Sequence, residues 1–245
     1  MKNEVNSSGF PLQIAIKNVV DATSSLHGWS TVFTEHAWKH PGDQDSGFID
    51  LVLKNSSKTQ ILLLECKRVK STQWHFLVEN NKPDRRHAKS FVFRANGENI
   101  NRFEWLDLTM SPSTPESSFC VIPGTGQDVK KTLIERASGE LLSSCEALAH
   151  EDRRLMLKDR DTYKIYSNAI VTTATLYVCK FDPKDISIGN GEINNPEFLE
   201  VPYIRFRKQL LTSYSAPDIY AVFGDRELSR AKESTIFVVN AAHLT

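Results

Sequence analysis

The chain has 245 residues, 40% of them apolar and 24% charged, which is the balance of a globular protein and excludes a disordered or fibrous one. Its 30 Lys and Arg balance its 30 Asp and Glu, so bulk positive charge cannot hold it on nucleic acid, although a local basic surface stays open. The length allows one large domain, and we expect residues 1–245 to form a single domain.

Cysteine usage and the lack of long apolar runs predict where the protein resides. The four cysteines are scattered without a CxxC pair, which argues against a zinc ribbon or a disulfide framework and fits a reducing compartment. The first ten residues are polar and lack the apolar centre of a signal peptide. Apolar runs such as Ile61–Leu64 are far shorter than the roughly 20 residues that span a bilayer. We therefore expect a soluble, cytoplasmic protein without a membrane partner.

The first quarter of the chain predicts one helix and three strands. Apolar residues recur at helical spacing over 11–26, and Gly28 supplies a stop. Residues 29–38 have the composition of a strand, and the Gly-, Pro- and Asp-rich stretch after them is typical of a turn. Two further apolar runs, 48–54 and 60–68, are separated by only five polar residues, so we expect an antiparallel hairpin.

The remainder predicts an insertion, a long helix and further strands. We treat residues 69–126 as an insertion that carries short strands at 91–94 and 101–108. Apolar residues at three- and four-residue steps predict a helix over 127–156. This order favours a mixed α/β fold in which a central mixed sheet is flanked by helices. Later strands, the second of them an edge strand because of its proline, are predicted at 169–181, 201–210 and 234–240.

Three ionic residues of the predicted hairpin form the most informative pattern in the sequence. If the turn is centred between Ser57 and Lys58, Asp50 lies directly opposite Glu65. Side chains alternate along a strand, so Glu65 and Lys67 share one face, and Asp50 can point to the same face. Two carboxylates and an ammonium group would then converge at the end of the hairpin. A register slip of one residue would separate them.

Such a cluster predicts metal-assisted hydrolysis of a phosphodiester. Two neighbouring carboxylates suit Mg²⁺ or Mn²⁺, which retains waters that can act as nucleophiles. Lys67 would orient or help to deprotonate the attacking water, or steady the phosphoryl oxygens. The alternative is a simple salt bridge between Lys67 and a carboxylate, which charge spacing alone would favour. The adjoining apolar strand residues favour the functional interpretation, because charges are rare there unless paired or functional.

The segments FIDLVL (Phe48–Leu53) and LLLECKR (Leu62–Arg68) resemble the core of the PD-(D/E)XK nuclease superfamily. That superfamily has an Asp on its second core strand and an acid-x-Lys on its third. The resemblance implies a restriction-endonuclease-like core, a central mixed sheet flanked by helices, with an insertion after the third core strand. The chain departs from the pattern in having Ile49 where the family often has Pro, and in the length of that insertion.

The resemblance also implies roles for individual residues. It makes Asp50 and Glu65 metal ligands, the backbone carbonyl of Cys66 a third ligand and Lys67 the catalytic lysine, with Mg²⁺ as the cofactor and Mn²⁺ as a substitute. Family members often add an upstream acid. The predicted first helix has no well-placed Glu, so the candidate is Glu35, which is equally well explained as a solvated strand residue. Weaker candidates in the following turn are Asp43 and Asp45.

Residues 67–94 are basic although the whole chain is neutral. They contain eight Lys or Arg and two acids, a net charge of +6, with aromatic residues interleaved. Positive charge and aromatic rings beside a metal cluster suit a nucleic acid, while the alternative is a solvated loop balanced by neighbours. Arg205 and Arg207 form a second basic spot, for which we expect an ordinary solvated strand face. The candidate nucleic-acid contacts are Arg68, Lys70, Arg85, Arg86 and Lys89.

These patterns together favour a Mg²⁺-dependent endodeoxyribonuclease, with a defence or repair system as one setting. The alternative is a catalytically silent nuclease-fold module that binds nucleic acid or a protein partner; the long insertion and the missing helix Glu motivate it. Because no separate DNA-recognition domain or ATPase motif is recognisable, a homodimer or a subunit of a larger assembly is a further expectation. The sequence leaves DNA or RNA, and duplex, single-stranded or branched substrates, open.

Overall fold

The structure, a computed structural model, describes residues 1–39, 46–70, 72–81, 86–96, 99–124, 132–156, 162–210 and 225–244. Its helices are α1 (Lys2–Ser7), α2 (Phe10–Ala22), α3 (Ser24–His27), α4 (Leu133–Met156) and α5 (Asp225–Lys232). Its strands are β1 (Trp29–Lys39), β2 (Ser46–Asn55), β3 (Gln60–Lys67), β4 (Gln73–Glu79), β5 (His87–Asn96), β6 (Asn99–Thr109), β7 (Glu116–Ser117), β8 (Cys120–Val121), β9 (Thr162–Thr172), β10 (Thr175–Phe181), β11 (Glu197–Glu200), β12 (Tyr203–Gln209) and β13 (Glu233–Asn240).

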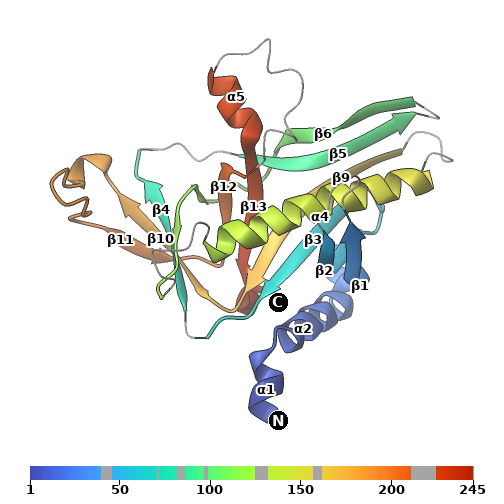
Figure 1. Ribbon diagram of the computed structural model, residues 1–245, viewed down its shortest axis with the longest axis horizontal. Coiled ribbons are helices and arrows are strands. Elements are labelled where there is room, and N and C mark those ends of the chain that lie inside the picture. Colours follow the sequence, from blue (N-terminus) through green and yellow to red (C-terminus); the bar gives the residue numbers. More distant parts are fainter. Residues whose placement is uncertain are drawn as a thin grey trace.

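A nine-stranded mixed sheet forms the centre of the described structure (Figure 1). Strands β1, β2 and β3 form an antiparallel meander at one end. Strand β9 then lies parallel to β3, and β13 lies parallel to β9. From β13 the sheet continues through β12 to β7. Strand β5 pairs with β9, and β6 pairs with β5. The expected mixed α and β architecture is therefore confirmed.

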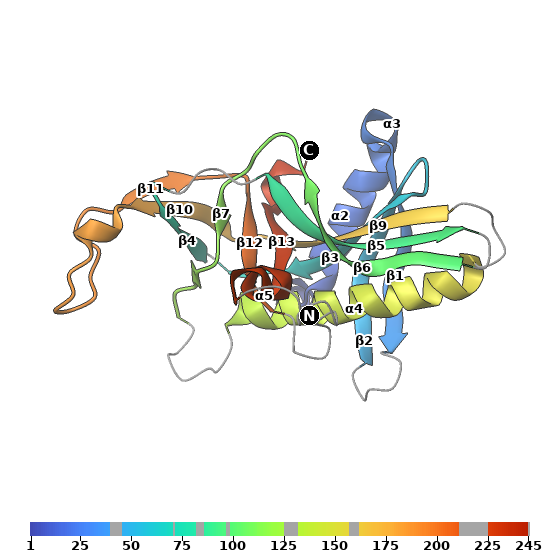
Figure 2. The same cartoon turned by 90° about the horizontal axis from the view of Figure 1, so that it is seen from above.

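Helices cover both faces of the meander, α2 on one side and α4 on the other (Figure 2). The buried residues of α4, including Ile134, Leu141 and Cys145, recur on one helical face and pack into the larger core. Those of α2, Ile16 and Val20, pack against the opposite sheet face. Among the described helices, none has both the length and the apolar character needed to cross a membrane.

The β2–β3 hairpin forms as the sequence predicts. The two strands are antiparallel, with Leu51 opposite Leu64 and Lys54 opposite Ile61. This is the register that results from a turn centred between residues 57 and 58, so the predicted alignment is confirmed. The helix predicted over 11–26 is also present, although it is divided at Thr23 into α2 and α3, and Gly28 ends it in a left-handed conformation.

A second sheet projects from the side of the first, with the strand order β11-β10-β4-β8 (Figure 1). It begins where the single strand predicted over 169–181 divides into β9 and β10, so that prediction is wrong. At the break, Thr173 accepts a hydrogen bond from the Val69 amide (2.9 Å) and donates one to its carbonyl (2.8 Å). This long-range contact turns the chain from one sheet into the other, and the β-branched sequence there carries no local turn signal.

The segment 69–126 contributes strands to both sheets. The short strands predicted at 91–94 and 101–108 lie within β5 and β6 of the main sheet. The same segment supplies β4 and β8 to the second sheet and β7 to the far end of the first. Its description as an insertion into a family core stays a prediction.

Strand β12 was expected at an edge and with exposed arginines, and both expectations are wrong, because β12 lies between β13 and β7 and its arginines are buried. It pairs with β13 along its length and with β7 at two residues, and Pro202 lies just before the strand rather than in its ladder. Arg205 is 1% exposed and Arg207 is 4% exposed. Arg207 is stabilised in this position by ion pairs with Asp107 (3.0 Å) and Glu233 (2.7 Å). Buried charges of this kind require partners.

Candidate metal centre

Three acidic residues lie in one row across β1, β2 and β3. The β1–β2 pairs on either side place Glu35 opposite Asp50. The next pair along β2 and β3, Leu51 with Leu64, places Asp50 opposite Glu65. The three strands that begin the sheet therefore bring together the acids that the sequence singled out.

The Asp50 carboxylate is held by the backbone of the neighbouring strand. Its Oδ2 accepts a hydrogen bond from the Cys66 amide at 2.7 Å. Burial raises the pKa of Asp50, the Cys66 hydrogen bond opposes this effect, and the charge of Glu35 adds to it. The side chain of Asp50 is thus aimed at the part of β3 that carries Glu65 and Lys67.

Glu65 and Lys67 form an ion pair on β3. Burial and the neighbouring Asp50 charge raise the pKa of Glu65 to about 7. Burial disfavours the charged form of Lys67, but the carboxylates of Glu65, Glu140 and Asp50 outweigh it and raise the pKa of this lysine. Two repelling carboxylates and one ammonium group therefore share a partly buried site.

Gln13 on α2 is a polar residue of the site that the sequence interpretation missed. Its buried amide donates one hydrogen bond to Glu35 Oε1 and another to the Asp50 carbonyl, both at 2.7 Å. Glu35 has a φ of 50°, a left-handed conformation that is uncommon for a residue other than Gly. The spacing of Gln13 with Ile16 and Val20 places it on the buried helix face, which was the available signal.

Glu140 on α4 is a second acid that the sequence did not connect with the hairpin. Its charge contributes to raising the pKa values of both Glu65 and Lys67, so it lies within electrostatic range of them. The residue is exposed on the helix surface. Only the packing of α4 across the meander brings it to this place, and no local pattern predicts that packing.

The oxygen donors of the site fit a hard divalent cation. Within the described residues, no three His, Cys, Asp or Glu side chains form a metal-holding group. Mg²⁺ needs no such group, because it retains several waters and commonly binds one or two carboxylates. Asp50 and Glu65 supply these; burial raises the pKa of both carboxyl groups, and the Asp50 charge adds to the rise at Glu65, so a dication between them would be favourable. Cys66 can offer only its carbonyl, since its buried thiol has a raised pKa.

Lys89 is not available for the nucleic-acid contact that the sequence suggested, and this candidate is corrected. Its side chain is buried, and its Nζ donates hydrogen bonds to the carbonyls of Arg230 (2.7 Å) and Ala231 (2.9 Å). These carbonyls belong to the last turn of α5, where a cation is favourable. Lys89 therefore anchors α5 to β5.

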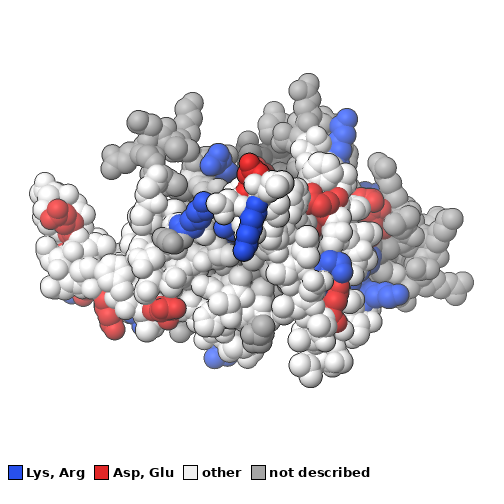
Figure 3. All heavy atoms as spheres, turned by 90° about the horizontal axis from the view of Figure 1, so that it is seen from below, with Lys and Arg blue, Asp and Glu red and all other residues white. Residues whose placement is uncertain are grey.

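Of the other basic candidates, two follow β3 along the chain, one lies just before β5 and one lies outside the described residues. Arg68 and Lys70 follow the end of β3, and Arg86 is exposed just before β5. Arg85, like Asp43 and Asp45, lies outside the described residues. On the face in Figure 3, the described Lys and Arg side chains are interspersed with Asp and Glu rather than gathered in one broad basic area.

No protein-family model matches the chain, and no curated protein or solved structure matches it either. The interpretation of the site therefore depends on its own geometry and chemistry. Within the described structure, these are the row of acids, the lysine beside it and the helices that contribute Gln13 and Glu140.

Proposed function

We propose that the chain is a divalent-metal-dependent nuclease that hydrolyses phosphodiester bonds, with DNA as the favoured substrate. The observation that supports it is the meeting of Asp50, Glu65 and Lys67 at one partly buried site, with the pKa of both carboxylates raised. Carboxyl groups whose pKa values are shifted in this way are concentrated at functional sites. A lone structural salt bridge would not require the second buried carboxylate.

The order of elements supports a restriction-endonuclease-like core as the finer description of the fold. Helix α2 precedes the meander β1–β3, helix α4 follows on the opposite face, and β9 then lies parallel to β3. This order resembles the PD-(D/E)XK core that the hairpin motif suggested. In this proposal, residues 69–126 are an insertion between the third core strand and the second core helix.

Each residue of the site has a separate role in the proposed hydrolysis. Mg²⁺ bound there would supply a nucleophilic water and neutralise charge that develops on the phosphate. Asp50 and Glu65 would hold it, with the Cys66 carbonyl as a third donor. Lys67 would orient or help to deprotonate the attacking water, or donate a hydrogen bond to the phosphoryl oxygens.

Cleavage of plasmid and single-stranded DNA with Mg²⁺ or Mn²⁺ tests the proposal. We expect Lys67→Ala and Glu65→Ala to lower the rate by about 10²-fold or more, because each removes a group that acts on the reacting phosphate. Lys184→Ala and Glu197→Ala, which alter surface residues near the second sheet, serve as matched controls and should cleave like the wild type. Undiminished cleavage by both site variants would refute the nuclease assignment.

A silent binding module is the second candidate, and the internal contacts of the acids favour it. Glu65 is paired with Lys67, and Glu35 is held by Gln13. Calorimetric titration with Mn²⁺ separates the two functions. Binding that disappears in Asp50→Asn supports the enzyme, whereas a wild-type protein that binds no Mn²⁺ supports the module.

A further inference from the structure

A cleft lies between α4 and the end of the β1–β2 hairpin at which β1 ends and β2 begins. Its volume is about 610 Å³, which is within the range of roughly 300–1,000 Å³ that small-molecule sites occupy. Its walls combine two aromatic rings with charged and hydroxyl groups, among them Trp38, Phe48, Arg136, Glu140 and Ser143. A mixed lining of this kind suits a flat ring that has polar edges.

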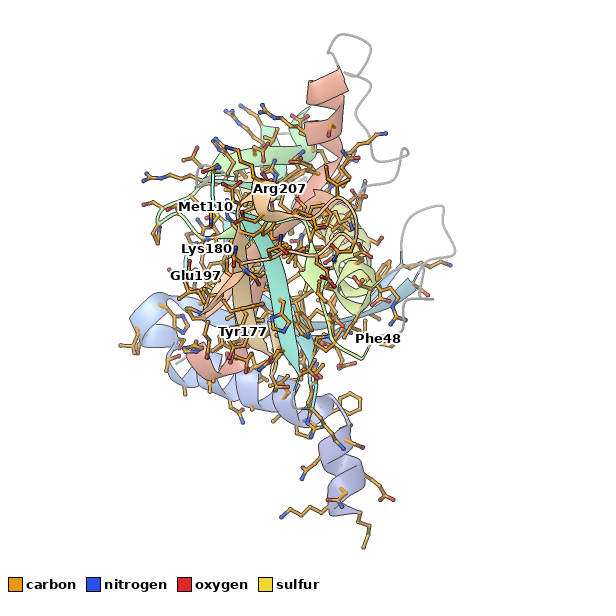
Figure 4. The ribbon with its side chains drawn as sticks, turned by 90° about the vertical axis from the view of Figure 1, so that its left-hand side faces the viewer. Phe48, Met110, Tyr177, Lys180, Glu197 and Arg207 are labelled. Atoms are coloured by element: carbon orange, nitrogen blue, oxygen red, sulfur yellow. The ribbon has the colours of Figure 1, made fainter. Side chains whose placement is uncertain are left out.

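The cleft adjoins the metal centre. Phe48 lies on β2 two residues before Asp50, and Figure 4 shows it close to α4. Glu140 lines the cleft from the helix side, and its charge acts on both Glu65 and Lys67. A group held in the cleft would therefore lie next to whatever occupies the metal centre.

The walls of the cleft leave an aromatic surface open. Phe48 is 63% exposed, although it lines the cleft together with the partly buried Trp38. Across from them, Gly139 of α4 also lines the cleft, and a Cβ atom added there would meet nothing within 4 Å. The space beside the ring of Phe48 can thus receive another ring.

The charge distribution favours binding of a nucleic acid by stacking of its bases on aromatic side chains over binding through its phosphates. Proteins bind duplex DNA largely through many phosphate contacts, whereas they bind unpaired strands by stacking bases on aromatic side chains. Three basic residues of the described structure, Lys89, Arg205 and Arg207, are buried. The described charges in Figure 3 are of mixed sign. An exposed ring beside the metal centre supplies the stacking component.

We propose that this cleft binds an unpaired nucleobase, stacked on Phe48, of the strand whose phosphate lies at Asp50 and Glu65. Arg136 and Ser143 offer hydrogen-bond donors to the edge of the base. The substrate class is then DNA with unpaired bases, such as a single strand or a frayed end. The role of the cleft in substrate choice rests on the proposed nuclease function, whereas base binding itself can be measured without it.

Binding of a fluorescein-labelled single strand of about 12 nucleotides, and of the matching duplex, tests the cleft by anisotropy. A Lys67→Ala background limits cleavage during the measurement. Phe48→Ala should weaken single-strand binding between about fivefold and about a hundredfold, the effect of one lost stack, and Phe48→Trp should retain binding. Phe10→Ala is the matched control, since Phe10 is similarly exposed (59%) on α2. It should bind like the background protein.

Filling the cleft from its other wall gives an independent test. Gly139→Leu should block the base and weaken single-strand binding, whereas Gly139→Ala should not. Unchanged binding in both Phe48→Ala and Gly139→Leu would overturn the inference, and so would a duplex that binds as tightly as the single strand.

Mn²⁺ titration and cleavage of the wild-type protein separate the two proposals. If Mn²⁺ binding and cleavage occur but Phe48 is dispensable for strand binding, only the cleft assignment fails. If neither Mn²⁺ binding nor cleavage occurs, while strand binding still depends on Phe48, the nuclease proposal fails and the base site stands.

Discussion

At the scale of single residues, Glu65 of the candidate metal centre combines burial with a neighbouring negative charge. Its side chain is 12% exposed, and burial and Asp50 raise its pKa from the ordinary 4.5 to about 7. A carboxyl group whose pKa is raised by folding binds its proton more tightly in the folded state. The resulting stabilisation is complete below about pH 4.5 and is lost as the pH rises through about 7.

Without a bound metal ion, the protein should therefore lose up to about 3 kcal/mol of stability through Glu65 as the pH rises from about 4.5 to about 7. Glu65→Gln cannot ionise, so it should remove this part of the pH dependence and unfold at higher urea concentration than the wild type at pH 8. Urea unfolding in EDTA across this pH range measures the effect. Glu197→Gln, an exposed control on β11, should keep the wild-type profile. A parallel pH dependence in Glu65→Gln and the wild type would contradict the prediction.

The residues of the site differ in how far the sequence could reveal them. Asp50, Glu65 and Lys67 follow from counting outward from a short turn, because antiparallel pairing fixes which residues are opposite. Gln13 reaches its position through the packing of α2, and Glu140 through the packing of α4. Nothing in the local sequence of either helix specifies the strand against which it packs.

At the scale of elements, β12 shows how an alternating pattern can be misread. Its apolar and basic residues alternate, which predicts one buried face and one solvated face. The basic face is instead covered by other elements. Arg205 donates a hydrogen bond to the Thr114 carbonyl, and Arg207 pairs with Asp107 of β6. Side chains do alternate along β12, but the elements that cover its second face are set by the tertiary structure.

This burial predicts a large cost for removing Arg207. Arg207→Ala should lower the free energy of unfolding by on the order of 3 kcal/mol, because it leaves Asp107 and Glu233 without their cation. The exposed Arg94 of β5 offers a matched control, and Arg94→Ala should change stability by no more than about 0.5 kcal/mol. Chemical unfolding of both variants provides the comparison. If Arg207→Ala and Arg94→Ala had the same free energy of unfolding, Arg207 would not be essential to this group of ion pairs.

At the scale of the whole molecule, one apolar core joins the two sheets. The larger core cluster contains Leu63 of β3 and Ile236 of β13 from the main sheet, with Phe76 of β4 and Leu176 of β10 from the second. Residues in one continuous core lose their packing together. The projecting sheet in Figure 1 is therefore expected to unfold with the main sheet and not before it.

Leu176→Ala tests this coupling. Since Leu176 is fully buried, its loss should cost about 2–5 kcal/mol and shift far-ultraviolet circular dichroism and tryptophan fluorescence to the same new midpoint. Leu199→Ala on the exposed strand β11 is the matched control and should have little effect. Two separate transitions, or a shift in one probe only, would show that the second sheet unfolds independently.

From the local sequence one can predict the first helix, the three-stranded meander, the hairpin register and the three central ionic residues. Each of these depends on interactions between residues that are near in the chain, where helical spacing, strand alternation and a short turn leave few choices. Tertiary packing instead places β9 and β10 in different sheets, buries Lys89, Arg205 and Arg207, and brings Gln13 and Glu140 to the candidate metal centre. These features depend on contacts between distant segments, whose pairing no local pattern specifies.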